Sequence, residues 1–460
     1  MIDLVKNTFK DKTFLKTFFS IAFPVMIQSL LSFIVSFVDT FMISAVSNEA
    51  VSAVYAVNQA GYIFLIASFG AISGAAIFVQ QFNGAKDYKH VRQCFRYKWV
   101  VMLLLLAIMI PLYYIFGKDL VWFYCKSDKN NQLIYELGQE YLKIIIISYA
   151  IAAISTIYSD TLREMGKTKI PLFANAVSLV TNIVCNAIMI YLVANKQPLA
   201  SVKGIAWATI IARVVELVLL VVICKTRKFE FDQRVFTHFR IEKDLLKNLI
   251  RKSIPLFFNE LFWSSGQVLM TMALSQRNGV LSALSIVSTM SNIFSIIFSG
   301  LAIGIGVMVG NTLGSGDLEK AQDNNKKLYV VGLSISLITG ILMMICSPFI
   351  PMLFAKVDPT QKALASKLIL IYGSLLWAFC LCTCFYNTLK SGGMALHTFL
   401  LDFIAMWCFT IPIAWILSTL TNIDMVWLYL VVQSTDMIKA FIGFLFVKQK
   451  KWVQNLTLLK

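Results

Sequence analysis

Long apolar stretches separated by short polar connections run through most of this sequence. Twelve of them have about the 20 mainly apolar residues that an α-helix needs to cross a bilayer. They cover residues 17–44, 50–82, 99–116, 133–157, 169–194, 204–224, 253–275, 283–310, 329–354, 368–386, 398–419 and 425–447. The apolar runs are continuous, unlike the roughly 10 alternating residues of a membrane β-strand. The sequence therefore predicts an all-α integral membrane protein with twelve transmembrane helices.

The composition agrees with a hydrocarbon environment. Of the 460 residues, 58% are hydrophobic and 14% are charged, whereas about 25% charged residues is usual in a soluble protein. This balance excludes a soluble enzyme. The first apolar stretch is too long for a cleavable signal and has no suitable small-residue cleavage site, so we expect it to be retained as the first membrane helix.

The basic residues are distributed unevenly between alternate connections. The net charge is +17, and 28 Lys and Arg fall in the connections that would be cytoplasmic if both termini were inside, against nine in the outer connections. Cytoplasmic loops of membrane proteins carry such an excess. We therefore predict a multi-pass protein of the plasma membrane with both termini in the cytoplasm, and we do not attribute the charge to nucleic acid.

The longest polar connection divides the spans into two sets of six. It runs from Lys225 to Lys252 and contains nine Lys or Arg. The predicted organisation is thus an N-terminal six-helix lobe (residues 1–224), a cytoplasmic linker (225–252), and a C-terminal six-helix lobe with a short cytoplasmic tail (253–460).

Several motifs of the first half recur in the second. PVMIQSLL at Pro24 is echoed by PLFFNELF at Pro255, and QQFNGAKD at 80–87 by GNTLGSGD at 310–317. TLREMGKT at Thr161 corresponds to TLKSGGMA at Thr388. An even number of spans per half gives both copies the same orientation in the bilayer, as in transporters with parallel repeats. We expect two pseudo-symmetric lobes that alternately open a central cavity to either side.

These motifs, in this order, resemble the multidrug and toxic compound extrusion (MATE) family. The resemblance rests on PVMIQSLL followed by VDTFMI, on the GAKD loop, on TLREMGKT with its partner LKSGG, and on LLDFIAMW, and it extends from about Lys16 to Lys448. It implies a bacterial exporter of small organic, often cationic, compounds, driven by protons or sodium ions. Neither a Walker sequence nor G-x-G-x-x-G is present, so direct use of ATP is not expected. We expect no cofactor beyond the ion gradient.

Charges inside the spans are the candidate coupling groups, because a charge in a membrane helix costs about 2.5–3.5 kcal/mol and calls for a partner or a task. Two opposite-charge pairs three residues apart, Arg213 with Glu216 and Asp436 with Lys439, are expected to neutralise themselves. Three acids lack such a local partner and are the predicted cation-coupling residues: Asp39, Glu260 and Asp402.

The resemblance supports the same three acids. Asp39 matches the acidic residue of the first helix of the family, Glu260 the acidic position of the seventh helix, and Asp402 the aspartate after the Gly-Gly turn. Members that bind sodium through an acid in the tenth helix have no counterpart here, because YGSLLWAFCLCTCFYNTL contains none. Protons and sodium ions both stay open as coupling ions.

Polar and aromatic side chains at membrane depth are the predicted substrate-cavity residues. They are Gln28, Asn175, Asn182, Asn259 and Trp263. Buried amides also commonly link helices, so a structural role is an equal alternative for these residues. The Gly-x-x-x-Gly pairs at Gly70/Gly74, Gly300/Gly304 and Gly306/Gly310 are expected to serve close helix packing.

Three other functions fit the same architecture in part. The first is a flippase for a lipid-linked saccharide or a peptidoglycan precursor, which should carry Arg for pyrophosphate in its cavity; spans one, seven and eight contain no Arg. An intramembrane enzyme would need clustered His, Asp or Ser, and a channel would not need a counter-ion gradient. We therefore predict a monomeric transporter that binds small organic compounds and lipid, with no enzymatic activity and no metal beyond a possible sodium ion.

Overall fold

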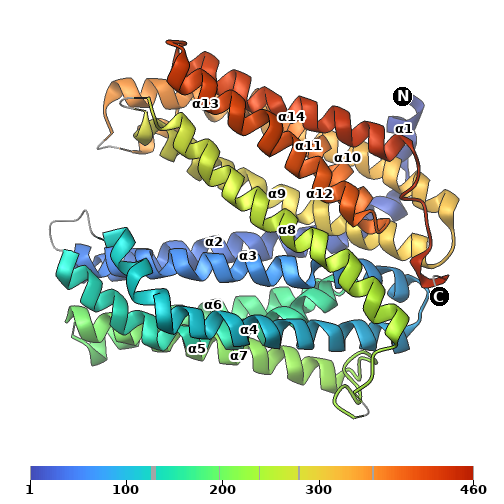
Figure 1. The fold of residues 1–460 in the computed structure, drawn as a ribbon, viewed down its shortest axis with the longest axis horizontal. Coiled ribbons are helices and arrows are strands. Elements are labelled where there is room, and N and C mark those ends of the chain that lie inside the picture. Colours follow the sequence, from blue (N-terminus) through green and yellow to red (C-terminus); the bar gives the residue numbers. More distant parts are fainter. Residues whose placement is uncertain are drawn as a thin grey trace. The chain divides into compact units, whose positions relative to one another are not determined.

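A computed structural model describes residues 2–125, 131–195, 197–237, 239–277, 280–354 and 357–458. The described chain is helical, with short turns between helices (Figure 1). Its elements are α1 (Ile2–Lys10), α2 (Lys12–Ser44), α3 (Asn48–Gly84), α4 (Tyr88–Cys125), α5 (Asn131–Glu164), α6 (Lys169–Ala187), η1 (Ile188–Val193), α7 (Pro198–Thr226), α8 (Lys243–Leu274), α9 (Leu281–Gly314), α10 (Leu318–Cys346), η2 (Ile350–Leu353), α11 (Pro359–Ser391), α12 (Ala395–Phe403), η3 (Ile404–Thr410), α13 (Ile411–Leu420), α14 (Met425–Lys448) and η4 (Leu456–Leu458).

Each predicted span coincides with a helix or with a run of consecutive helices. Eleven helical segments of the described chain are long and apolar enough to cross a membrane. The remaining predicted span lies in α8, which is less apolar because Asn259, Glu260 and Gln267 interrupt it. The eleventh predicted span is built from α12, η3 and α13 in succession.

The predicted helix ends differ from the observed ones by up to about ten residues. α4 begins at Tyr88 rather than at residue 99, and α8 begins at Lys243 rather than at 253, because charged residues extend these helices beyond the apolar stretch. The predicted end of the ninth span at residue 354 is wrong: α10 stops at Cys346. Pro348 and Pro351 follow directly, and proline cannot continue a helix in its interior.

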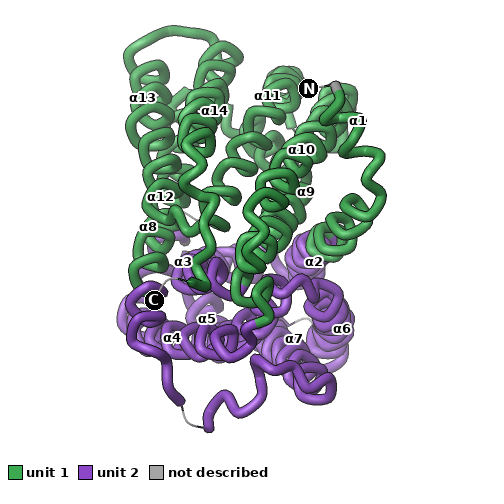
Figure 2. Tube along the Cα trace, turned by 90° about the vertical axis from the view of Figure 1, so that its right-hand side faces the viewer, with its two compact units in different colours: residues 1–26, 80–86, 250–460 green, residues 27–79, 87–249 purple. Residues whose placement is uncertain are grey.

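The described chain forms two compact units, which are coloured separately in Figure 2. Unit 2 comprises residues 27–79 and 87–249. In it α5 packs against α4 and α7, and α7 packs against α6. Unit 1 comprises residues 1–26, 80–86 and 250–460. In it α11 is central and packs against α9, α10 and α14.

Glycines let helices of unit 1 approach closely, as predicted. A Cβ at Gly300 would meet Ala22 and Met26 of α2, and one at Gly304 would meet Phe18. At the end of α3, a Cβ on Gly84 would collide with the backbone carbonyl of Asn311. Close backbone approach of this kind is available only where side chains are absent.

The contact between the ends of α3 and α9 is reciprocal. A Cβ on Gly314 would collide with the carbonyl of Gln81, and Gln81 precedes Gly84 by the same three residues by which Asn311 precedes Gly314. Asn83 also donates a hydrogen bond to Asn311 at 3.2 Å. The GAKD and GSGD motifs therefore end two equivalent helices that cross at their glycines.

The chain segment after α14 packs against these helix ends. Leu456 donates its backbone N–H to Gln81 Oε1 at 2.7 Å, and Gln81 donates to the carbonyl of Ser391 at 2.9 Å. Gln454 donates to the carbonyl of Gly392 at 2.6 Å. Trp452 and Leu456 are buried, so this tail belongs to the core of unit 1.

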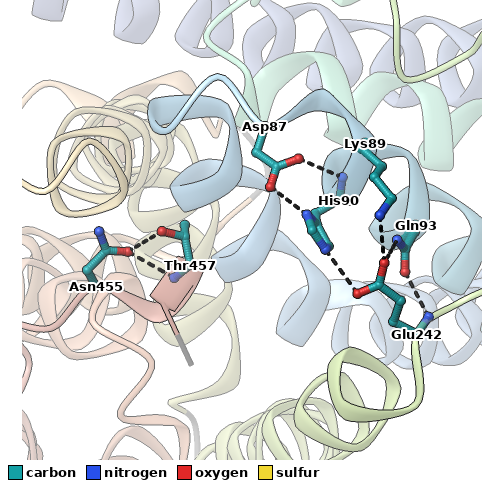
Figure 3. Close-up of polar contacts among 7 residues, drawn as sticks. All are labelled: Asp87, Lys89, His90, Gln93, Glu242, Asn455 and Thr457. Atoms are coloured by element: carbon teal, nitrogen blue, oxygen red, sulfur yellow. Dashed lines mark hydrogen bonds and ion pairs between the residues drawn. The ribbon is translucent and has the colours of Figure 1, made fainter. Parts of the chain in front are cut away.

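The linker between α7 and α8 is attached to the start of α4 by polar contacts (Figure 3). His90 lies between two carboxylates, with Nδ1 2.5 Å from Asp87 Oδ2 and Nε2 3.2 Å from Glu242 Oε2. Lys89 pairs with Glu242 at 3.0 Å. Contacts with Lys89, and then with Gln93 and His90, lower the pKa of the Glu242 carboxyl to about 2. These charges tie the linker to α4 at the surface of unit 2.

A buried ion pair joins α4 to α5. Lys98 Nζ lies 2.5 Å from Glu164 Oε2 and donates a hydrogen bond to Thr161 at 3.0 Å. The side chain of Lys98 is fully buried. In the second half, Thr388 corresponds to Thr161 and donates to Asn325 of α10 at 2.7 Å. The shift of 230 that aligns Asp87 with Asp317 places Leu328 at the position of Lys98, so the second copy has an apolar residue there.

This pair generates a test of stability. Glu164→Gln leaves the Lys98 ammonium buried without a carboxylate, so we expect it to lower the free energy of unfolding by about 3–5 kcal/mol. The double variant K98M/E164Q removes both charges at similar volume, and we expect it to lie much closer to the unmodified protein, because replacing both partners avoids the unpaired charge. Tryptophan fluorescence during thermal unfolding in detergent measures both. Equal Tm values for E164Q and the unmodified protein would contradict the role of the pair.

Candidate functional site

The carboxylate of Asp39 in α2 is held by an asparagine of α6 within unit 2. Asn186 Nδ2 donates to Asp39 Oδ1 at 2.6 Å and also to Asn182 Oδ1 at 3.2 Å. Asn186 is fully buried, and Asn182 is nearly so. The two asparagines are one helical turn apart and therefore lie on the same face of α6.

A basic residue of α7, Arg213, acts electrostatically on the carboxylate of Asp39. Arg213 is close enough to Asp39 to attract it, and its own ion pair with Glu216 is 2.7 Å long. The predicted ion pair between Arg213 and Glu216 is therefore present, and Arg213 also attracts the carboxylate of Asp39. One arginine shared by two acids leaves the site with an excess negative charge, which a proton or another monovalent cation would neutralise.

The other predicted polar residues of unit 2 are buried too. Gln28 accepts a hydrogen bond from Arg163 Nε at 3.2 Å, and Arg163 pairs with Asp160 at 2.5 Å. Asn175 is buried, and its Oδ1 has no hydrogen-bond partner among the described residues. Their assignment to a substrate cavity stays a prediction.

A cavity of about 300 Å³ lies in unit 2, and Thr40, the residue after Asp39, is among the residues that line it. It is lined by the end of α2, the start of α3 and the end of α4, including Thr40, Tyr55, Asn58 and Tyr124. Cavities of about 300 Å³ are at the lower end of the range for small organic ligands. The two tyrosines offer ring faces that attract cations.

Unit 1 holds a second acidic cluster, built from four helices. Glu260 in α8 accepts a hydrogen bond from Tyr386 of α11 at 3.3 Å. Asn259, the residue before Glu260, donates both to Tyr386 at 3.2 Å and to Asp402 Oδ2 of α12 at 3.0 Å. Glu260 and Asp402 thus belong to one hydrogen-bonded network, whereas Asp39 lies in the other unit.

The basic partner of Asp402 comes from α14. Lys439 Nζ lies 2.6 Å from Asp402 Oδ1. Lys439 also attracts Asp436, which lies three residues earlier on the same face of α14, but the ion pair that the structure gives for Lys439 is with α12. Asp402, which has no cation near it in the sequence, therefore has one in the fold.

Local backbone features accompany this second cluster. Asp402 is followed almost immediately by the π-helical segment η3, and such segments occur often at functional sites because they locally widen a helix. Pro255 lies inside α8, one turn before Asn259. Trp263, the remaining predicted cavity residue, lies one turn beyond Asn259 on α8 and is half-buried.

Three residues of these clusters were not among the predicted site residues: Asn186, Tyr386 and Lys439. The spacing of Asn182 and Asn186 gave a usable signal, because both had to lie on one face of their helix. Tyr386 and Lys439 contact the site from helices far away in the sequence. Local spacing cannot reveal such contacts.

The fold and these clusters define a membrane transporter: an all-helical, multi-pass protein that keeps carboxylates buried at membrane depth. The MatE family model matches residues 24–188 and 255–416. The chain belongs to this family, the multidrug and toxic compound extrusion family.

Individual relatives agree along nearly the whole chain. The probable multidrug resistance protein YoeA of Bacillus subtilis is 22% identical over 423 residues, covering 89% of this chain and 88% of the relative. The probable multidrug resistance protein NorM of Thermotoga maritima is 21% identical over 426 residues, covering 91% and 89%. A crystal structure of MATE in the bent conformation superimposes with a TM-score of 0.85 at 16% identity and covers 95% of both chains.

The family assignment confirms the predicted class. The fold is that of the MATE transporters, which have twelve transmembrane helices in two lobes. Members of the family are transporters rather than enzymes, act on small organic compounds and use ion gradients. The predicted bacterial origin is consistent with these relatives.

The Asp39 cluster generates a prediction about Asn186. Removing a hydrogen bond to a charged group costs about 1.5–3 kcal/mol, so Asn186→Ala should lower ion-driven efflux by about 10- to 100-fold. Thr181→Ala is the matched control: Thr181 lies on the same helix, its hydroxyl donates to the carbonyl of Val177, and the variant should leave the dependence on the ion gradient intact. The assay is efflux from reconstituted vesicles at equal protein content. Unchanged efflux by N186A would show that Asn186 does not contribute to ion coupling.

Proposed function

We propose that this protein is a secondary active multidrug exporter of the plasma membrane. It antiports organic, often cationic, compounds against protons or sodium ions by alternating access. It works as a monomer with both termini in the cytoplasm. The observation that carries the proposal is the presence, in a chain of a transporter family, of one acidic cluster in each unit: Asp39 with the buried Asn186, and Glu260 with the buried Asp402.

The coupling chemistry follows from what a carboxylate does at membrane depth. An ionised Asp39 or Glu260 is costly there unless it is neutralised, and a cation supplied from outside can neutralise it. A ligand shifts a conformational equilibrium only when it binds one state more tightly than the other. Binding of the cation must therefore favour one arrangement of the lobes, and release of the cation the other.

Alternating access uses the internal duplication. The six-helix lobes of residues 1–224 and 253–460 rock about the linker 225–252. Each opening exposes the substrate-binding cavity to one side of the membrane. The acids do not need to contact the substrate in this scheme. Substrate and cation become coupled because they favour different states of the same lobes.

Substrate binding relies on apolar, aromatic and amide groups. Tyr55 and Tyr124 line the cavity of unit 2, and the faces of aromatic rings attract flat organic cations. Gln28, Asn175, Asn182, Asn259 and Trp263 are the other residues proposed to contact the substrate. Such surfaces bind by shape and polarity, so they suit a range of compounds.

The test is efflux of a fluorescent organic cation from everted vesicles under an imposed proton gradient and then under an imposed sodium gradient. We expect the unmodified protein to respond to at least one gradient. Asp39→Asn and Glu260→Gln should each reduce gradient-driven efflux at least tenfold while leaving the amount of protein in the membrane unchanged, because an amide cannot exchange a proton or carry the charge that binds a cation.

Three outcomes would contradict the proposal. Normal efflux by both amide variants would show that Asp39 and Glu260 do not couple ion flow to transport. Flux that neither saturates nor needs a gradient would indicate a channel. Absence of cation efflux together with translocation of a lipid-linked pyrophosphate precursor would favour the flippase alternative.

A further inference from the structure

Lys439 is a buried base in the acidic cluster of unit 1. Its side chain is 16% exposed, and the side chain of its partner Asp402 is 6% exposed. A lysine at membrane depth is expensive, and most such residues near helix ends extend to the interface. Here the ammonium is instead held 2.6 Å from a carboxylate oxygen. The fold therefore places a positive charge beside an acid that the sequence leaves without a local partner.

The surroundings of this ammonium consist of oxygen ligands suited to a small cation. Asp402 supplies one carboxylate, and Asp436 of α14 is near enough to attract Lys439. Asn259 Nδ2 donates to the second oxygen of Asp402, and Asn259 Oδ1 is buried without a hydrogen-bond partner among the described residues. Carboxylate and amide oxygens are the ligands that hard metal cations prefer.

We propose that Lys439 determines which ion couples to transport: its ammonium is a tethered counter-cation that neutralises Asp402 and takes the place of a sodium ion. Glu260 is then the acid of this cluster that exchanges a proton. This inference rests on the proposed antiport function. Of the two coupling ions left open there, it selects the proton.

The charges around Glu260 agree with this assignment. The groups that act on it are Lys390, Asp402, Tyr386 and Lys439. With every acid and base ionised, the three acids Glu260, Asp402 and Asp436 and the two bases Lys390 and Lys439 leave one negative charge. A single proton on Glu260 makes the cluster neutral. Because Asp402 is already paired, no second cation is needed.

The hydrogen-bond network gives Glu260 a connection to the Lys439 pair. Tyr386 donates to Glu260 and accepts from Asn259, and the same asparagine donates to Asp402. Protonation of Glu260 removes the acceptor charge that Tyr386 faces, so the network can rearrange without breaking the ion pair. Lys439 is accordingly a positioning and specificity-determining residue that acts through Asp402.

The experiment removes the tethered charge and asks whether sodium replaces it. Lys439→Met removes the ammonium at similar volume, Lys439→Arg retains the positive charge, and D402N/K439M removes both charges. The full-length proteins are purified in detergent. Their Tm is then compared in NaCl and in choline chloride at equal ionic strength, and binding of radioactive sodium is measured directly.

We expect sodium to raise the Tm of K439M by about 3 °C or more, because a ligand that binds the folded state stabilises it. K439M should also bind sodium saturably, whereas the unmodified protein should show no saturable binding. K439R and D402N/K439M should show neither effect, since the first retains the counter-cation and the second has lost the carboxylate. In reconstituted vesicles, a sodium gradient should drive efflux by K439M but not by the unmodified protein.

Several outcomes overturn the inference. A folded K439M without sodium binding would do so, as would equal sodium binding by K439M and D402N/K439M. Specific sodium binding by the unmodified protein overturns it even where K439M does not fold. The binding and Tm measurements do not require transport, so failure of the proposed function, seen as no gradient-driven efflux by the unmodified protein, is distinguishable from failure of this assignment.

Discussion

The absence of water at membrane depth is the constraint on which this structure depends. Every buried charge must find its partner inside the protein, because hydrocarbon offers none. Lys98 finds Glu164, Lys439 finds Asp402, and Asp39 receives a hydrogen bond from Asn186. Each of these contacts joins two different helices, so the same interactions that offset the cost of burial also fix how the helices are arranged within their unit.

The internal duplication preserves backbone conformation more strictly than it preserves charge. Gly166 and Gly393 occupy equivalent positions, and both have a φ of +74°, a conformation that glycine adopts without steric cost. Thr161 and Thr388 likewise make equivalent contacts to the neighbouring helix. Yet the first copy carries the Lys98–Glu164 ion pair, whereas Leu328 and Ser391 occupy the equivalent positions of the second copy. After duplication, the turns and helix crossings stayed alike while the ionic groups diverged.

Hydropathy was enough to predict the helices and the class of membrane protein, because the cost of exposing polar backbone in lipid is a local property of each apolar stretch. It could not predict the first turns of α4 and α8, whose charged residues continue the helix outside the apolar stretch. Spacing along α14 places Asp436 and Lys439 on one face but does not say which neighbouring helix that face meets. The pairing of Lys439 with Asp402 depends on how α12 packs against α14, and neither sequence pattern contains that information.

Glu260 and Asp402 of unit 1 have different partners, and the partners of a carboxylate determine whether its charge can change during transport. A group contributes to coupling only if its occupancy differs between two states of the transporter. In the assignment proposed above, Asp402 stays paired with Lys439 of a neighbouring helix in both states, so it positions the network without exchanging a cation. Glu260 accepts a hydrogen bond from the neutral Tyr386 and is attracted by Lys390, and in the same proposal it is the acid that exchanges a proton. Such a division of one acidic cluster into a fixed and an exchangeable member would set the stoichiometry, because one cation suffices to neutralise the cluster.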